Sequence, residues 1–448
     1  MALDLTALRK DLQSKNIDVL RLIYADVLGI TRSKDLLVSQ LENSAAHGPA
    51  FCQGVWVTTT QGGVLDGHGS ISDGLSDFVS QIVPASIHEL PWEPGVAYGV
   101  ANAFEPDGSD NPVAPRTALQ RVLNEYAELG LIPVIGTELE FYIAEQIEEQ
   151  WKPILHRKGR VYTTGAMVDR DGLFLHMLRM LDQMNIGIFA GNHEFAPGQF
   201  EINMWHGEAM ETTDRTLLFK TALKDIAARR GLNATFLGKP WADLEGSGFH
   251  LHFSVTDMNG ENKMHDGAEL SDTAKHMIAG ILQHANALTA FANPTVNAFK
   301  RLGPDTLAPS RANWGYDNRA TMLRVPPERG GGTRLEVRIG DGAANPYLVV
   351  ASVLAAGLDG IKRKLTPPAH AEGWAYENEA DALLPVTFAE ALDALDADPL
   401  FAEKLGATVV QTHLTLKRDE IERYEAEVSD PATRDITDWE LNEYIWDF

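Results

Sequence analysis

The stretch GTELEFYI, residues 136–143, alternates carboxylates with apolar side chains and decides the fold more than any other part of the chain. In a β-strand, residues two positions apart point to the same face of the sheet. Glu138 and Glu140 therefore share one face of a predicted strand. Because unpaired charges are costly to bury, this face predicts a binding surface that requires counter-ions.

Three further stretches repeat the alternation. They are GQFEINM (198–204) with Glu201, GFHLHFSV (248–255) with His250, His252 and Ser254, and TRLEVRIG (333–340) with Arg334, Glu336 and Arg338. A sheet that gathers four such faces would need cations and an anionic ligand to neutralise it, which is the chemistry of a two-metal phosphate site. The alternative for any single strand is an ordinary half-exposed strand with one solvated face.

Six side chains are candidate ligands for hard divalent cations, Mg²⁺ or Mn²⁺, which prefer carboxylate oxygens and, for Mn²⁺, accept an imidazole nitrogen. They are Glu138, Glu140, Glu194, Glu201, His250 and Glu336. Glu194 and Glu201 flank the turn at 196–198, so we expect them to converge from two adjacent strands. Six ligands make two sites of three, with positions left open for phosphate and water.

Arginines accompany the acids. Arg319, Arg324, Arg334 and Arg338 lie close to Glu336 along the chain, and Arg301 precedes them in a long loop. Arginine clamps phosphate or carboxylate through two parallel hydrogen bonds. The alternative is that these arginines pair with surface acids, which are abundant in a chain of net charge −25. The chain has neither a P-loop nor a dinucleotide-binding glycine fingerprint.

Length and composition indicate two domains in a chain of 448 residues. The segment EPDGSDNPVAPR (105–116) has the composition of a linker, so we predict domains at 1–111 and 112–448. Strands alternating with helices predict an α+β fold with an antiparallel sheet. The expected helices cover 3–16, 117–129, 171–185, 212–230, 271–292, 346–364, 388–396 and 410–428, with Thr212 or Thr213 and Ser271 as N-caps.

Several classes of protein are disfavoured. A net charge of −25 argues against a nucleic-acid binder or an anionic-membrane binder. A single cysteine, Cys52, fits a reducing compartment, and no apolar run of about 18 residues is present. We therefore expect a cytoplasmic, soluble protein.

Six ordered blocks resemble the signature segments of glutamine synthetase of the bacterial type I class. They are GTELEFYI (136–143), NHEFAPGQFEI (192–202), EGSGFHLHFS (245–254), NAFKRLGP (297–304), NRATMLRVP (318–326) and RLEVRIGDGAANPYL (334–348). The resemblance implies an N-terminal β-grasp domain, a larger catalytic domain and a homododecamer of two stacked hexameric rings with active sites between subunits. It also implies ATP as a substrate and two or more Mg²⁺ or Mn²⁺ ions in each site.

The resemblance assigns a role to each candidate residue. One metal site is Glu140, Glu194 and Glu201, and the other is Glu138, His250 and Glu336. His252, Ser254, Arg319, Arg324 and Arg334 are placed at ATP, with Arg319 and Arg338 at the transferring phosphoryl group. The residues placed at the substrates glutamate and amine are Arg301, Gly246, Glu140, Arg338, Glu245 and Leu307. Arg319, Arg338 and Glu194 are the predicted catalytic residues.

Departures from the family pattern fall around the nitrogen nucleophile. The glutamate that follows the loop arginine in glutamine synthetases is Leu307 here, with Asp305 two residues earlier. The ammonium-site aspartate has only Asp66 as a nearby counterpart, and the asparagine before the Gly-Ser-Gly is Glu245. The tyrosine that is adenylylated in regulated members is Ala380.

These departures favour one substrate class. A small cation needs anionic groups around it to bind and lose a proton, and Leu307 replaces a charge with apolar surface. We expect a ligase that joins glutamate to an amine, either an alkylamine, ethanolamine, a polyamine or an aromatic amine. Three alternatives stay open: an ammonia-using glutamine synthetase, a non-enzymatic protein of this fold, and a ligase acting on another acid.

Overall fold

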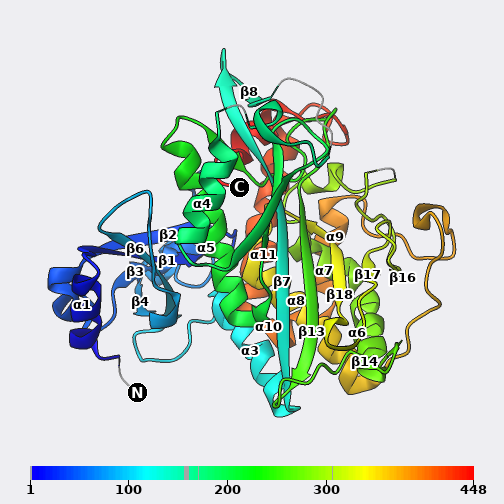
Figure 1. Ribbon diagram of the computed structural model, residues 1–448, viewed down its shortest axis with the longest axis horizontal. Helices are drawn as coiled ribbons and strands as arrows, with labels where there is room; N and C mark the ends of the chain where they lie inside the picture. The colour runs from blue at the N-terminus through cyan, green and yellow to red at the C-terminus, as the bar shows by residue number, and fades with distance from the viewer. Residues whose placement is uncertain (1–2, 156–160, 170, 305) are drawn as a thin grey trace.

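A computed structural model describes residues 3–155, 161–169, 171–304 and 306–448 (Figure 1). A small N-terminal sheet lies beside a larger unit, whose long strands cross the centre of Figure 1 in front of a group of helices. This arrangement confirms the predicted α+β class. No helix among the described residues is both long and apolar enough to cross a bilayer.

Within the described residues, the N-terminal sheet has six strands in the order β2-β1-β6-β4-β3, with β5 paired to β6. The strands are β1 (Val19–Ala25), β2 (Thr31–Leu37), β3 (Ala50–Cys52), β4 (Asp77–Ile82), β5 (His88–Glu89) and β6 (Val96–Phe104). β1 and β6 run parallel, and the other pairs run antiparallel. Helices α1 (Leu5–Ser14) and α2 (Leu41–Ala45) belong to this unit.

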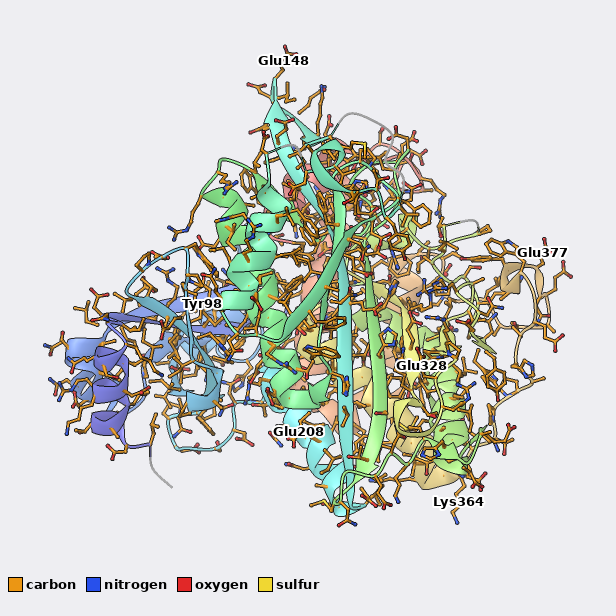
Figure 2. The ribbon with its side chains drawn as sticks, in the orientation of Figure 1. Tyr98, Glu148, Glu208, Glu328, Lys364 and Glu377 are labelled. Carbon is orange, nitrogen blue, oxygen red and sulfur yellow. The ribbon has the colours of Figure 1, made fainter. Side chains whose placement is uncertain are left out.

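The larger sheet has ten strands among the described residues, in the order β16-β17-β18-β13-β7-β10-β9, with β8, β11 and β12 also paired to β7. The strands are β7 (Leu131–Ile147), β8 (Gln150–Pro153), β9 (Ile188–His193), β10 (Gln199–Met204), β11 (Gly207–Glu208), β12 (Asn233–Thr235), β13 (Gly248–Asp257), β16 (Trp314–Tyr316), β17 (Leu323–Val325) and β18 (Leu335–Asp341). A separate hairpin joins β14 (His265–Asp266) to β15 (Glu269–Leu270). β7 continues into β8 through a hairpin whose tip carries Glu148 (Figure 2).

The strand order brings together the four stretches that carry polar faces. β18, β13, β7 and β10 are consecutive neighbours, and all three pairings between them are antiparallel. The register places Glu138 opposite His250, and Glu140 opposite Glu201. Their apolar faces supply buried core residues such as Leu139 and Leu251. The four predicted strands and their common sheet are therefore confirmed.

One helix of the larger unit, α8, is buried along most of its length. The helices of this unit are α3 (Pro115–Glu128), α4 (Leu173–Gln183), α5 (Ala209–Ala228), α6 (Asp272–Gln283), α7 (Ala285–Ala292), α8 (Pro346–Arg363), α9 (Phe388–Ala397), α10 (Pro399–Leu405), α11 (Ala407–Glu427) and α12 (Asp438–Tyr444). The side chain of Asn345 caps α8 by accepting hydrogen bonds from two backbone amides in its first turn. Glycines allow α6 and α8 to touch, because a Cβ at Gly360 would lie only 1.9 Å from the carbonyl oxygen of His276.

Three helix predictions need correction. The predicted helix over 271–292 begins at its predicted cap, Ser271, but is divided at His284, whose ring binds Asp398 and Asp359. Helix α5 begins after Glu208 rather than at a threonine, because Thr213 bonds back to the carbonyl oxygen of Ala209 inside the helix. The short helices α10 and α12 were not predicted.

Candidate active site

Carboxylates and imidazoles meet across the centre of the larger sheet. Glu138 on β7 has one oxygen 3.2 Å from Nε2 of His252 and the other 3.9 Å from Nδ1 of His250, both on β13. Glu140, two residues along β7, accepts a hydrogen bond from the backbone amide of Gly248 at 2.8 Å. Each of these groups comes from a strand whose alternation points it to one face, so the sheet itself concentrates the charge.

Glu336 is the most enclosed acid of this face, with a side chain only 1% exposed. Its two oxygens accept hydrogen bonds from two guanidinium groups, Oε2 from Arg324 at 2.7 Å and Oε1 from Arg338 at 2.5 Å. Burial alone would raise the pKa of Glu336, but Arg338 and the neighbouring His252 and His250 outweigh it and lower that pKa to about 2. Glu336 is therefore a permanent anion between cations.

His252 connects the acids to Arg334. Nε of Arg334 donates to Nδ1 of His252 at 3.2 Å, so in the neutral imidazole the proton belongs on Nε2. Nε2 lies 3.2 Å from Glu138 and 3.9 Å from Glu336, and is buried without a hydrogen-bond partner of good geometry among the described residues. A protonated Nε2 cannot ligate a metal, so this arrangement favours His250 over His252 as the imidazole ligand.

Two groups of described residues bring ligand atoms within 4.8 Å of one another: Glu138, His252 and Glu336, and Glu138, Glu201 and His250. The sequence divided the ligands differently, with His250 beside Glu336 and Glu201 beside Glu140 and Glu194. The reason is that Arg324 and Arg338 hold both oxygens of Glu336, while Glu138 stands between the two imidazoles. A donor set of carboxylates with one imidazole fits Mg²⁺ or Mn²⁺.

Glu194 and Glu201 are two acids of the cluster whose charged forms are disfavoured by their surroundings. Glu194 follows β9, and its backbone amide bonds to the carbonyl oxygen of Gln199 at 2.9 Å, which confirms the predicted turn between the two acids. Burial, followed by the charge of Glu140, raises the pKa of Glu194 to about 7. Burial and the charges of Glu138 and Glu140 also raise the pKa of Glu201. These carboxylates need cations in order to ionise together.

Metal-free protein is expected to lose stability as pH rises from 5 to 7. In this window the folded chain keeps a proton on Glu194, whose pKa is about 7 against an ordinary 4.5, and the unfolded chain does not. Raising the pH therefore lowers the free energy of unfolding. We expect the melting temperature of chelator-treated protein to fall by about 2 °C across the window, and excess Mg²⁺ or Mn²⁺ to remove the fall. A flat or rising profile without metal would contradict the raised pKa.

The predicted glutamate site lies next to the acids. The Arg301 side chain is 4% exposed and runs along Gly246, where an added Cβ would lie 2.7 Å from Cγ of Arg301. A Cβ at Gly248 would meet both Nε2 of His250, at 2.7 Å, and Nη2 of Arg301, at 2.8 Å. Glycine at these positions therefore leaves room for the arginine to pass beside the metal-ligand candidates. Glu245 itself is exposed, and its backbone carbonyl accepts the hydroxyl of Tyr142.

A cavity of about 230 Å³ opens beside the acid cluster. Its walls include three of the residues predicted to bind ATP, His252, Ser254 and Arg334, together with Glu138 and the glycines of the segment 331–332. The sequence did not indicate a further lining pair, Phe189 and Trp205, whose rings stack with centroids 4.4 Å apart. Both are about half exposed, at 51% and 56%, which is unusual for large apolar side chains. An aromatic residue directly after the polar-faced strand β10 was the available signal.

Three of the predicted arginines, Arg319, Arg324 and Arg334, make contacts within the protein. Arg319 is exposed and reaches the cluster through its backbone carbonyl, which accepts from Nε of Arg338 at 3.1 Å. Arg324 is held by Glu336 and Asp317, so its guanidinium positions an acid of the cluster. Arg334 also pairs with Glu328, labelled in Figure 2, at 3.0 Å.

The predicted nucleophile residues are on loops. Leu307 is half-buried in the loop closed by the bridge between Gly303 and Ala308, with its backbone in the left-handed region at φ 56°. Asp66 is exposed in the N-terminal unit. Asp305 lies outside the described residues.

Known proteins are similar to this chain along almost its whole length. Glutamine synthetase of Pyrococcus horikoshii is 34% identical over 445 residues, which cover 97% of each chain. Glutamine synthetase of Thermus thermophilus is 35% identical over 452 residues, with 97% of each chain covered. Among solved structures, a GmaS/ADP complex is similar with a TM-score of 0.83 and 32% identity over 97% of this chain and 98% of that one.

A further structure, of a novel glutamine synthase homolog, has the same fold, with a TM-score of 0.83 at 24% identity over 96% of this chain and 99% of that one. The family model for the glutamine synthetase catalytic domain matches residues 112–444. The order of the polar-faced strands, their shared acid cluster and these similarities lead to one conclusion: the chain belongs to the glutamine synthetase family.

Proposed function

We propose that this protein is an ATP-dependent ligase that joins the γ-carboxyl group of glutamate to an amine. The observation that carries the proposal is the position of Arg301, which lies against Gly246 and Gly248 and within reach of the acid cluster. A carboxylate substrate held there would lie between a buried guanidinium and the metal-ligand candidates. Ligase chemistry with ATP follows from family membership, and the choice of amine is the proposal.

We propose that ATP binds in the cavity beside the cluster. The stacked rings of Phe189 and Trp205 offer an apolar surface to a nucleobase, while His252, Ser254 and Arg334 stand nearer the acids. The solved GmaS/ADP complex of similar fold supports a nucleotide site in this architecture.

Metal ions would be held by Glu138, Glu140, Glu194, Glu201, His250 and Glu336, and would neutralise the charge on the transferring phosphoryl group. The observation that fits two or more cations is that burial and neighbouring carboxylates raise the pKa values of Glu194 and Glu201.

The reaction has two steps. An oxygen of the glutamate γ-carboxylate attacks the γ-phosphorus of ATP and releases ADP, which gives γ-glutamyl phosphate. The amine nitrogen then attacks the acyl carbon, phosphate leaves, and the nitrogen loses a proton. Arg338 and Arg319 are assigned to the phosphoryl group, Arg301 and Gly246 to glutamate, and Arg324 to the orientation of Glu336. Glu194 is assigned to accept the proton that the nitrogen loses.

Leu307 favours an amine that carries carbon over ammonium. An apolar side chain cannot stabilise a small cation, but it can contact an alkyl or aryl group. The exposed carboxylate of Glu245 is available to a distal ammonium or hydroxyl group of the amine. A cytoplasmic homododecamer is the expected form of the enzyme.

Ammonia-using glutamine synthetase is the second candidate. Relatives that are 34% and 35% identical over nearly the full chain carry that name. In this candidate the exposed Asp66 serves the ammonium site of a neighbouring subunit.

Phosphate release from ATP distinguishes the candidates. The enzyme is assayed with glutamate and Mg²⁺ across ammonium, methylamine, ethanolamine, isopropylamine, putrescine, spermine and aniline. Activity with one amine far above ammonium supports the amine ligase and names its substrate. Best activity with ammonium identifies a glutamine synthetase. Silence with every nucleophile rejects both.

Leu307→Glu is expected to raise the ratio of ammonium use to amine use by about tenfold, because the new carboxylate favours a small cation by about 1.4 kcal/mol. The measurement is kcat/KM for ammonium and for the best amine of the panel. Leu307→Met, which keeps an apolar side chain, serves as the control and should leave the ratio unchanged. An unaltered ratio in Leu307→Glu would mean that this residue does not line the nucleophile pocket.

A further inference from the structure

Glu440, in the unpredicted helix α12, is a buried carboxylate outside the acid cluster. It is 0% exposed. One oxygen accepts a hydrogen bond from Nδ2 of Asn297 at 2.8 Å. The other accepts from Nζ of Lys300 at 2.5 Å, and from the backbone and hydroxyl of Thr437, each at 2.8 Å. Every one of these partners is close to the candidate glutamate site or belongs to the N-cap of α12.

The first branch leads to Arg301. Lys300 precedes it directly, and the Lys300 side chain is 7% exposed. Besides Glu440, its ammonium group donates to the carbonyl oxygen of Asp435 at 2.6 Å. Arg434 donates to the carbonyl oxygens of Lys300 and Leu302, at 3.2 and 3.1 Å, on either side of Arg301. The segment 434–440 therefore holds the backbone that carries the candidate glutamate-binding arginine.

The second branch leads to Gly246. Asn297 exchanges two hydrogen bonds with the backbone of Lys239, its Oδ1 accepting at 2.8 Å and its Nδ2 donating at 2.9 Å. The preceding residue, Gly238, accepts the backbone amide of Ser247 at 2.8 Å. An added Cβ at Gly246 would lie 2.6 Å from the carbonyl oxygen of Gly238, so the backbone segments at these two glycines are in contact. Glu440 is thus joined to both halves of the candidate glutamate site.

We propose that Glu440 is a positioning residue for glutamate, which sets the distance between Arg301 and the Gly246 backbone through Lys300 and Asn297. This role rests on the proposed function. Among the described residues, the Glu440 carboxylate bonds to Asn297, Lys300 and Thr437, none of which is a metal-ligand candidate, so it acts through the two segments it joins. A buried acid that served stability alone would need no more than the pair with Lys300 and the cap of α12.

The substitution Glu440→Gln tests the proposal. Glutamine keeps the shape but removes the charge that holds Lys300, so the backbone at Arg301 is expected to shift. Small misplacements of binding groups cost about tenfold or more. We expect the KM for glutamate to rise about tenfold, the KM for ATP to stay within about twofold, and kcat to fall by less than about threefold, which is the pattern of lost substrate binding.

Glu443→Gln is the matched control. Glu443 lies on the same helix, is also buried, and pairs with Arg423 at 2.7 Å and with Gln61 of the N-terminal unit at 2.5 Å, away from Arg301. It should lower the melting temperature without raising the KM for glutamate beyond about twofold. Equal effects of the two substitutions on that KM, or an unchanged KM in Glu440→Gln, would overturn the positioning role.

Asn297→Ala provides a second route, because it removes the branch to Lys239 while the ion pair with Lys300 remains. The same selective rise in the KM for glutamate is expected. If neither variant folds, the network is purely structural and the proposal is rejected. Wild-type protein that releases no phosphate with glutamate and any nucleophile would instead reject the proposed function, so the two failures are distinguishable.

Discussion

Glu336→Gln is expected to lower kcat by about a thousandfold. Glu336 is a permanent anion, 1% exposed, with Arg324 at 2.7 Å and Arg338 at 2.5 Å. Removing its charge weakens one metal site and leaves two guanidinium groups without their shared partner. Metal ions supply several kcal/mol of barrier lowering in phosphoryl transfer, and about 4 kcal/mol corresponds to a factor of about a thousand.

The measurement is the turnover with the best nucleophile of the panel, accompanied by a melting curve to establish that the variant is folded. Arg324 keeps its pair with Asp317 at 2.6 Å, so the fold is expected to persist. Glu403→Gln removes an exposed acid that pairs with Lys404 at 2.7 Å, and should keep full activity. A Glu336→Gln variant with more than about a tenth of wild-type turnover would contradict the ligand assignment.

Arg301→Lys is expected to raise the KM for glutamate by about a hundredfold. The guanidinium is buried, and its Nη1 donates to the carbonyl oxygen of Ile339 at 3.2 Å, which fixes the direction of the remaining N–H groups. Lysine keeps the charge but cannot form two parallel hydrogen bonds with a carboxylate. Losing these two hydrogen bonds costs about 3 kcal/mol, which lowers the affinity for glutamate about a hundredfold.

Initial rates at varied glutamate, with saturating ATP and amine, give this KM directly. Arg363→Lys is a suitable control, because Arg363 ends α8 at the surface and pairs with Asp359 at 2.8 Å. An Arg301→Lys variant with an unchanged KM for glutamate and an altered KM for the amine would move Arg301 to the nucleophile side of the site.

The sheet could be predicted from sequence because alternation has a period of two that strands impose and helices do not. The four polar-faced strands and their common sheet followed from that period. Helix boundaries depended on tertiary contacts instead. His284 divides a continuous helical pattern because its ring reaches Asp359 on α8 and Asp398 at the N-cap of α10, at 3.1 and 2.6 Å. No local pattern contains those partners.

The alternation predicted which acids and imidazoles share a face of the sheet, and it did not predict which of them lie nearest to one another. Which imidazole lies nearest to which acid depends on a register shift in the pairing of β13 with β18, between Phe249 and Leu251. That irregularity brings His252 to Glu336 on one side while His250 faces Glu138 on the other. The rings of Phe189 and Trp205 stack because the ends of two neighbouring strands bring them together, and neither residue by itself predicts this contact. The contacts of Glu440 span about 140 residues of sequence, beyond any local motif.

The order of strands also governs how the chain reaches its native state. Glu138 and Glu336 lie about 200 residues apart along the chain, and they meet only when β13 has paired with both β7 and β18. Closing such long loops is entropically costly and slow. During synthesis, the full set of acids cannot assemble until β18 has emerged, so tight cation capture by a refolding chain would mark the completion of the sheet rather than its nucleation.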